Sequence, residues 1–148
     1  IALVGGSFGG SVVLVAGAKI PAVRSIIALA APIDWRNLPK SEESLRDIYR
    51  SIRRGYRQIW RVTKAEWRRL ERGTADLNPV DYIPALRRKR VCLIHGLQDR
   101  VVPPETSATF YVLLGPGPHR LILVKNGRHF GHDVLGRKKL MREVQEWL

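Results

Sequence analysis

The first eleven residues read IALVGGSFGGS, so an apolar stretch runs into the pattern Gly-x-Ser-x-Gly and then into a second apolar stretch. The residues before Ser7 predict a strand, and the segment from about Phe8 to Ala18 predicts a helix. A serine on such a sharp turn holds its hydroxyl clear of both elements, and Gly5 and Gly9 leave room for the crowded backbone. This pattern is typical of a nucleophile elbow. It predicts Ser7 as a nucleophile and the backbone N–H of Phe8, at the helix N-terminus, as an oxyanion donor.

Two other interpretations of the glycine-rich turn are open. A turn between a strand and a helix can bind a phosphate, but the segment from Gly5 to Ser11 lacks the lysine of the G-x-x-x-x-G-K-[ST] fingerprint. The glycines can also serve a purely structural turn, in which Ser7 caps the helix and takes part in no chemistry. A serine nucleophile of this kind needs an acid and then a histidine later in the chain, so the downstream segments decide between the interpretations.

Two later segments each combine a predicted buried strand with a loop that carries ionisable side chains. Residues 90–96 form a short apolar run that ends in glycine, and Asp99 lies in the loop after it. Residues 121–124 form a second run, and the loop after it contains His129 and His132. Because active-site groups of open α/β sheets lie at the carboxyl ends of the strands, we expect a histidine of this last loop to reach the elbow serine.

Five stretches that span the chain carry a resemblance to known proteins. They are residues 5–10 (GGSFGG), 31–35 (APIDW), 78–82 (NPVDY), 94–103 (IHGLQDRVVP) and 127–130 (GRHF). In this order they resemble the C-terminal half of an α/β-hydrolase and, more narrowly, the catalytic domain of the prolyl oligopeptidase family. Dienelactone-hydrolase-like and carboxylesterase-like enzymes carry much the same signals. The resemblance implies an α/β fold with a mostly parallel sheet flanked by helices, and it implies no cofactor and no metal.

The resemblance also implies roles for individual residues. Ser7 would be the nucleophile, Asp99 the acid that orients the base, and a histidine of the final loop the base itself. His129 is favoured, because a glycine two residues before it and an aromatic residue after it fit the family pattern, and His132 is the alternative. Asp34 is the alternative acid, since it also follows an apolar run and some relatives take their acid from that strand.

These roles imply a serine hydrolase that cleaves a small peptide or ester substrate through a covalent acyl-enzyme. The resemblance is strongest to a prolyl oligopeptidase-family peptidase, and a carboxylesterase or dienelactone-hydrolase-like enzyme is the alternative. A different class stays open as well, namely a non-enzymatic module that binds a polyanion and carries a vestigial triad. Labelling by a fluorophosphonate would favour the enzyme, whereas salt-dependent binding of nucleic acid without labelling would favour the module.

Positive charge is the feature that the resemblance does not explain. The chain has a formal net charge of +13. A helical insertion or lid is expected at residues 36–76, and its arginines at positions 46, 50, 53 and 57 recur at helical spacing. We interpret this stripe, Arg46, Arg50, Arg53 and Arg57, as a solvated helix face, with nucleic acid or another anionic partner as the alternative.

Length and composition complete the expectations. The 148 residues, 45% of them hydrophobic, suffice for one domain, and the elements are expected in the order strand, helix, strand, insertion, strand, helix, strand, helix. The chain starts at Ile1 on a strand that should lie in mid-sheet, so we expect a partial catalytic domain that is poorly soluble alone. No run approaches the ~20 apolar residues of a membrane span.

The single cysteine, Cys92, suggests a reducing, cytoplasmic location. His95 is expected to be packed and hydrogen-bonded, and His119 to be a solvated strand start.

Overall fold

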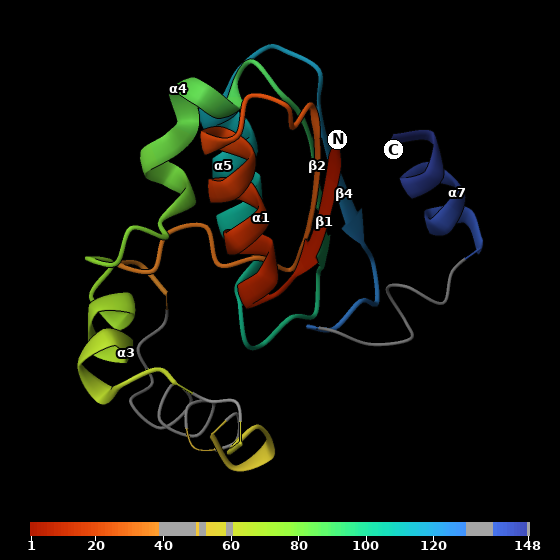
Figure 1. Ribbon diagram of the computed structural model, residues 1–148. Helices are drawn as coiled ribbons and strands as arrows, with labels where there is room; N and C mark the ends of the chain where they lie inside the picture. The colour runs from red at the N-terminus through yellow and green to blue at the C-terminus, as the bar shows by residue number, and fades with distance from the viewer. Residues whose placement is uncertain (39–49, 51–52, 59–60, 130–137, 148) are drawn as a thin grey trace.

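A four-stranded parallel β-sheet forms the centre of the computed structural model, which describes residues 1–38, 50, 53–58, 61–129 and 138–147 (Figure 1). The strands are β1 (Ala2–Gly6), β2 (Ser25–Leu29), β3 (Arg90–Gly96) and β4 (His119–Val124). They lie side by side in sequence order, and each neighbouring pair is parallel. The α/β fold predicted from the sequence is therefore confirmed, and the strand expected at residues 90–96 has those bounds.

Helices cover both faces of the sheet. The helical elements are α1 (Phe8–Lys19), α3 (Lys64–Glu71), the 3₁₀ turn η1 (Pro79–Tyr82), α4 (Ile83–Leu86), α5 (Pro104–Leu114) and α7 (Lys138–Trp147). In Figure 1, α1, α4 and α5 lie on one side of the sheet and α7 lies on the other. Parallel strands joined by helical crossovers are buried on both faces, and all five residues of β2 are buried, as this arrangement requires.

The two faces of the sheet bury two separate apolar clusters, because successive strand residues point to opposite sides. On one side, Ile26 and Ala28 of β2 pack with Leu14 of α1 and Phe110 of α5. The intervening residues of β2 and β3 point to the other side, where the buried Val144 of α7 joins the cluster. Alternation along the central strands thus holds helices on both faces of the sheet.

The strand register aligns the carboxyl ends of the four strands at one edge of the sheet. Gly6 pairs with Leu29, Leu29 pairs with Ile94, and Gly96 pairs with Val124. The loops that follow β1, β3 and β4 therefore start at the same edge. These are the loops that carry the serine, the aspartate and the histidine singled out in the sequence.

A third apolar cluster holds α3 beside this edge. The helix begins at a capping box, in which Thr63 accepts a hydrogen bond from Glu66 N and the Glu66 side chain accepts one from Thr63 N. Trp67 and Leu70 then pack against Trp35, which follows β2. The other members of this cluster are Leu38, Val102, Ala75 and Leu77. The capping box predicted from Thr63 and Glu66 is confirmed, so α3 is anchored at the carboxyl edge of the sheet.

The insertion expected at residues 36–76 is described only in part. Residues 39–49, 51–52 and 59–60 lie outside the described residues, and so does Arg46 of the predicted arginine stripe. Cys92 is buried on β3. Within the described ranges, no helix combines the length and the apolar character that crossing a lipid bilayer would require.

Candidate active site

Ser7 stands at the turn between β1 and α1 with an unusual backbone. Its φ and ψ angles are 51° and −126°, a conformation that costs a non-glycine residue free energy and is found mainly at functional turns. Two backbone hydrogen bonds hold this turn: Ser7 N donates to Leu29 O at 2.8 Å, and Gly10 N donates to Ser7 O at 2.9 Å. The surrounding structure therefore holds Ser7 in the strained conformation that a nucleophile elbow requires.

Two glycines of the elbow are needed because neighbouring atoms crowd against them. A Cβ added to Gly5 would lie 2.3 Å from Gly9 O, and a Cβ added to Gly10 would lie 2.5 Å from Ala31 Cβ. A Cβ added to Gly9 would meet no atom within 4 Å among the described residues. The expectation that Gly5 and Gly9 make the room is therefore correct for Gly5, whereas Gly10 rather than Gly9 is the second close contact.

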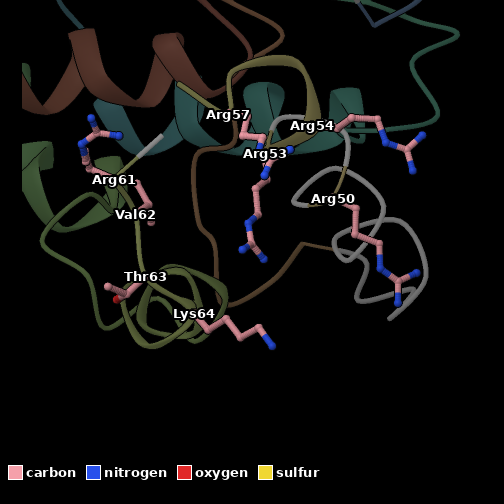
Figure 2. A pocket seen from close by; sticks show the side chains of 8 residues that line it. All are labelled: Arg50, Arg53, Arg54, Arg57, Arg61, Val62, Thr63 and Lys64. Carbon is pink, nitrogen blue, oxygen red and sulfur yellow. The ribbon is translucent and has the colours of Figure 1, made fainter. Parts of the chain in front are cut away.

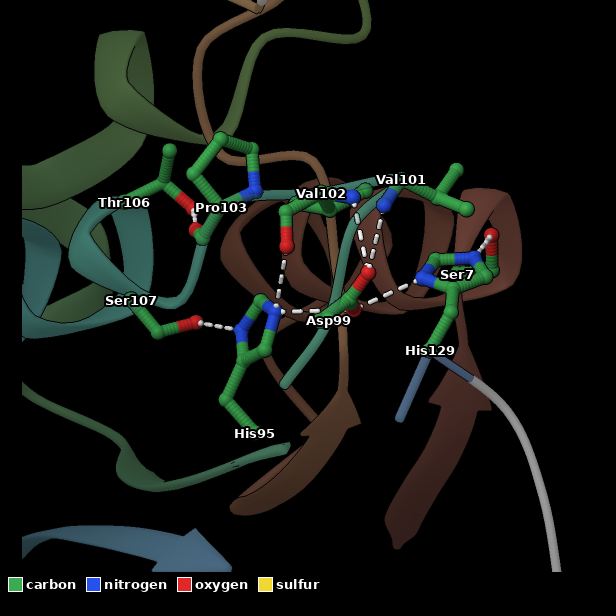
Figure 3. A network of polar contacts seen from close by, with 9 residues as sticks. All are labelled: Ser7, His95, Asp99, Val101, Val102, Pro103, Thr106, Ser107 and His129. Atoms are coloured by element: carbon green, nitrogen blue, oxygen red, sulfur yellow. Dashed lines mark hydrogen bonds and ion pairs between the residues drawn. The ribbon is translucent and has the colours of Figure 1, made fainter. Parts of the chain in front are cut away.

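A continuous chain of hydrogen bonds joins the serine, the histidine and the aspartate (Figure 3). Ser7 Oγ lies 2.8 Å from His129 Nε2, and His129 Nδ1 lies 2.7 Å from Asp99 Oδ2. Because a carboxylate can only accept, Nδ1 carries the proton in this contact, and the neutral ring then offers Nε2 as the acceptor for the serine hydroxyl. The structure thus brings together three residues that the sequence separates widely.

The side chain of Asp99 is completely buried, and its carboxylate accepts hydrogen bonds from donors on both oxygens. Oδ1 accepts from the backbone N–H groups of Val101 and Val102 at 2.8 and 2.9 Å, and Oδ2 faces His129 Nδ1 and His95 Nε2. Burial alone would raise the pKa of this carboxyl, but the hydrogen bonds from His129, His95 and the two backbone groups outweigh it and hold the pKa well below its usual range. The carboxylate is therefore ionised at neutral pH.

His95 is a second histidine on the same carboxylate oxygen. Its Nε2 lies 3.1 Å from Asp99 Oδ2 and 3.0 Å from Val102 O, and its Nδ1 lies 2.7 Å from Ser107 Oγ. Since Nε2 faces two acceptors, it carries a proton and donates toward them, while Nδ1 shares a hydrogen bond with the Ser107 hydroxyl. The sequence predicted a packed, hydrogen-bonded His95, which is confirmed, but not its contact with the aspartate. The spacing of four residues between a histidine and an aspartate at the end of a strand was the available signal.

Neither Asp34, the alternative acid, nor His132, the alternative base, is part of the described hydrogen-bond chain. Asp34 accepts hydrogen bonds from Arg36 Nε at 2.8 Å and Asn37 Nδ2 at 2.7 Å, and the described contacts do not link it to a histidine. Burial would raise the pKa of Asp34, but the hydrogen bonds and charge of Arg36 hold it below its usual value.

His132 lies outside the described residues. Phe8 is the first residue of α1, so its N–H has no partner within the helix and lies next to the serine.

A hollow of about 690 Å³ opens beside Asp99 and His129. It is lined by Asp99 and His129 and by Leu97, Gln98, Arg100, Val101 and Arg128. The side chain of His129 is 21% exposed, so this ring borders the hollow while its Nε2 contacts the serine. An open space next to a pair of hydrogen-bonded ionisable groups is the usual setting of a binding or reaction site.

The loops that carry Asp99 and His129 touch through two glycines. A Cβ added to Gly96 would lie 2.3 Å from both the carbonyl carbon and the oxygen of Gly127 and 2.7 Å from Arg128 O. The Gln98 N–H donates to Gly127 O at 2.8 Å across the same contact. The backbone of one loop therefore rests directly on the backbone of the other, and this contact sets the distance between the aspartate and the histidine.

Gly96→Ala is expected to separate these loops, because the added methyl group meets backbone atoms that cannot rotate away. Overpacking of this kind typically costs about 1–3 kcal/mol of stability. A shift of about 1 Å between reacting groups can lower a rate about 10²-fold. The measurements are the melting temperature and the turnover of a p-nitrophenyl ester.

Gly55→Ala is the matched control for that substitution, because a Cβ at Gly55 would meet no described atom within 4 Å. It should leave both the melting temperature and the turnover nearly unchanged. Equal behaviour of the two variants would contradict the role given to the glycine contact.

Comparison with known proteins assigns the family. The model of the prolyl oligopeptidase family matches residues 1–148, which is the whole chain. The chain belongs to the prolyl oligopeptidase family. No curated protein matches it.

Solved structures with the same fold include both esterases and peptidases. The chain is similar to an α/β hydrolase enzyme from a sediment metagenome of the Mar Chica lagoon in Morocco, with 19% identity and a TM-score of 0.66. The match covers 99% of this chain and 60% of the Mar Chica enzyme. A lipase-esterase related protein from Clostridium acetobutylicum shows 19% identity and a TM-score of 0.69, over 100% of this chain and 66% of that one. The acylaminoacyl peptidase of Pyrococcus horikoshii shows 22% identity and a TM-score of 0.66, over 99% of this chain and 23% of that one.

These likenesses establish the α/β-hydrolase fold of this prolyl oligopeptidase family member. The chain spans about three fifths of the length of the Mar Chica enzyme. Family and fold together support a hydrolase of the serine esterase or peptidase type.

Proposed function

We propose that this chain carries the catalytic residues of a serine hydrolase, with Ser7 as nucleophile, His129 as base and Asp99 as the acid that orients the base. The observation that carries the proposal is the hydrogen-bond chain from Asp99 Oδ2 through the imidazole to Ser7 Oγ, with both distances within the reach of about 2.6–3.2 Å expected for such groups. The strained elbow and the family membership support it.

The geometry supports a two-step reaction. As Ser7 Oγ bonds to the carbonyl carbon of the substrate, its proton passes to His129 Nε2, and Asp99 stabilises the imidazolium that forms. The carbonyl oxygen becomes an oxyanion, which the N–H of Phe8 and the amino end of α1 stabilise. The bond to the leaving group then breaks, and that group takes the proton from Nε2. Water, deprotonated by the same imidazole, attacks the acyl-enzyme and restores Ser7.

The proposed substrate is a small peptide or ester. Between these two, we propose a peptide, which would make the enzyme a peptidase. It is supported by the match to the prolyl oligopeptidase family over the whole chain. The esterase alternative is supported by the likeness to a lipase-esterase related protein. Parallel measurement of kcat/KM for a p-nitrophenyl ester and for a blocked dipeptide p-nitroanilide tests the choice. Amide hydrolysis within about a hundredfold of ester hydrolysis would favour the peptidase, and ester hydrolysis alone would favour the esterase.

A non-enzymatic module that binds a polyanion is the second candidate, and the arginine-rich segment before α3 favours it. That candidate requires a triad that does no chemistry, yet the three side chains have the geometry of a working one. Labelling of the protein by a fluorophosphonate, with turnover of a p-nitrophenyl ester, is the expected result. Nucleic-acid binding that weakens steeply with salt, without any labelling, would instead favour the module.

His95 is proposed as a positioning residue that acts through Asp99. His95→Leu removes one of the two donors to Oδ2, so the carboxylate can tilt away from His129. A loss of about 10- to 100-fold in kcat/KM is expected. Without the hydrogen bond from His95, Asp99 Oδ2 keeps more negative charge and attracts the imidazolium of His129 more strongly. The acid limb of the profile of kcat/KM against pH should therefore move to higher pH.

His95→Gln is the matched control, because its amide N–H can take the place of the ring N–H toward Asp99. It should restore most of the activity and return the acid limb of the pH profile toward that of the natural protein. If His95→Leu lowers the melting temperature but leaves the pH profile where it was, His95 is only a packing residue.

A further inference from the structure

A strongly cationic hollow lies at the amino end of α3 and is lined by none of the three residues of the proposed triad. Its volume is about 850 Å³ (Figure 2). Six of its eight lining residues are cations, and none of the described residues that line it is acidic. The cations are Arg50, Arg53, Arg54, Arg57, Arg61 and Lys64. In Figure 2, Arg53 and Lys64 extend into the space between the segment at residues 53–57 and the start of α3.

Such a concentration of one charge favours an anionic ligand. Like charges that share a hollow repel one another, and an anion bound among them removes that repulsion. Arg53, Arg54 and Arg57 are among these cations, and a planar guanidinium group can donate two parallel hydrogen bonds to a carboxylate or a phosphate. The chemistry of the lining therefore selects a carboxylate or phosphate group rather than a neutral or cationic one.

Packing places this hollow on the same side of the molecule as Ser7. Lys64 begins α3, and α3 is held by its buried Trp67 against Trp35. The ring of Trp35 in turn makes an edge contact with the ring of Phe8, with centroids 5.9 Å apart, and Phe8 directly follows the elbow serine. Val102, whose backbone N–H donates to Asp99 Oδ1, belongs to the same apolar cluster. In Figure 1 the segment at residues 53–57 and α3 both lie beyond the carboxyl ends of the strands.

We infer that this hollow, centred on Arg53, Arg57 and Lys64, binds an anionic group of the substrate and selects acyl compounds or peptides that carry a carboxylate or phosphate away from the bond to be cleaved. The inference rests on the proposed hydrolase function and names its substrate class. The anion is held by charge and by guanidinium hydrogen bonds, while the ester or amide carbonyl lies at Ser7.

The test compares p-nitrophenyl esters with and without a terminal carboxylate. The anionic set is the hemisuccinate, hemiglutarate and hemiadipate, and the neutral set is unbranched acyl esters of matching length. Arg53→Gln/Arg57→Gln should lower the ratio of kcat/KM for the best anionic ester to that for its neutral partner by about 10-fold. Added salt should lower the same ratio in the natural protein, because the site is exposed to solvent.

A second double variant separates local recognition from overall charge. Arg24→Gln/Arg88→Gln removes the same two charges, but these exposed residues precede β2 and β3 at the opposite edge of the sheet. It should leave the ratio unchanged. An equal fall in both double variants, or no fall in Arg53→Gln/Arg57→Gln, would overturn the inference and leave the hydrolase function standing.

A binding measurement that needs no turnover keeps the two proposals distinguishable. Glutarate and inorganic phosphate are titrated separately into the whole protein at low salt, with heat as the readout. Binding that weakens about 10-fold in Arg53→Gln/Arg57→Gln but not in Arg24→Gln/Arg88→Gln supports the anion site, and the stronger of the two probes identifies its preferred group. Loss of turnover and labelling with this binding intact would reject only the hydrolase. Tight RNA binding with no discrimination between the esters would reject the substrate site in favour of a polyanion surface.

Discussion

Replacement of Ser7 by alanine is expected to abolish labelling by a fluorophosphonate and to lower kcat for a p-nitrophenyl ester by about 10⁶-fold, the loss typical of a removed serine nucleophile. The hydroxyl that contacts His129 Nε2 is the atom that must bond to the substrate, and the described neighbours offer no other nucleophile to that nitrogen. The measurements are labelling of the whole protein followed by mass spectrometry, and single-turnover kinetics with the ester.

Ser11→Ala is the matched control in the same segment. Ser11 is buried, and its hydroxyl donates to Pro32 O at 2.5 Å, so its removal costs stability but leaves the elbow hydroxyl in place. This variant should melt at a lower temperature and still be labelled. Labelling that persists in Ser7→Ala would show that the nucleophile lies elsewhere.

Asp99→Asn is expected to lower kcat by about 10⁴-fold with little change in the backbone. Both carboxylate oxygens accept hydrogen bonds from donors: two backbone N–H groups face Oδ1, and His129 and His95 face Oδ2. An amide places an NH₂ group at one of these positions whichever way it is turned. Turned toward the histidines, it favours the ring form of His129 that carries its proton on Nε2, which cannot accept the proton of the serine.

Asp34→Asn tests the alternative acid with the same chemical change. Asp34 is bonded to Arg36 and Asn37, so its replacement should change kcat by no more than a few-fold. Both variants are compared by steady-state kinetics, with circular dichroism as the check on folding. A large loss in Asp34→Asn together with a small loss in Asp99→Asn would transfer the role of the acid to Asp34.

The parts of the fold that the sequence predicted are those with local signals. The apolar run at 90–96, the capping box of Thr63 and Glu66, and the Gly-x-Ser-x-Gly turn each lie within a few neighbouring residues. A parallel sheet then brings the loops after its strands to one edge, so the proximity of Ser7, Asp99 and His129 followed from topology.

The parts that the sequence did not predict depend on residues far apart in the chain. The contact between Gly96 and Gly127 arises because two loops cross, and no local pattern marks it. His119 was expected to be solvated, yet both of its ring nitrogens are buried without a hydrogen-bond partner in the described structure, and burial lowers its pKa. A Cβ on Gly117 would lie 2.6 Å from His119 Nε2, so the turn before β4 covers the ring.

The order of the strands has a consequence for biosynthesis. The serine follows β1 and the histidine follows β4, 122 residues later. A chain that leaves the ribosome amino end first therefore carries its proposed nucleophile long before the base is made. Until β4 pairs with β3, the loop after β4 does not hold His129 beside the serine hydroxyl, so the proposed nucleophile lacks its proposed base. The onset of turnover would therefore report that β4 has paired with β3.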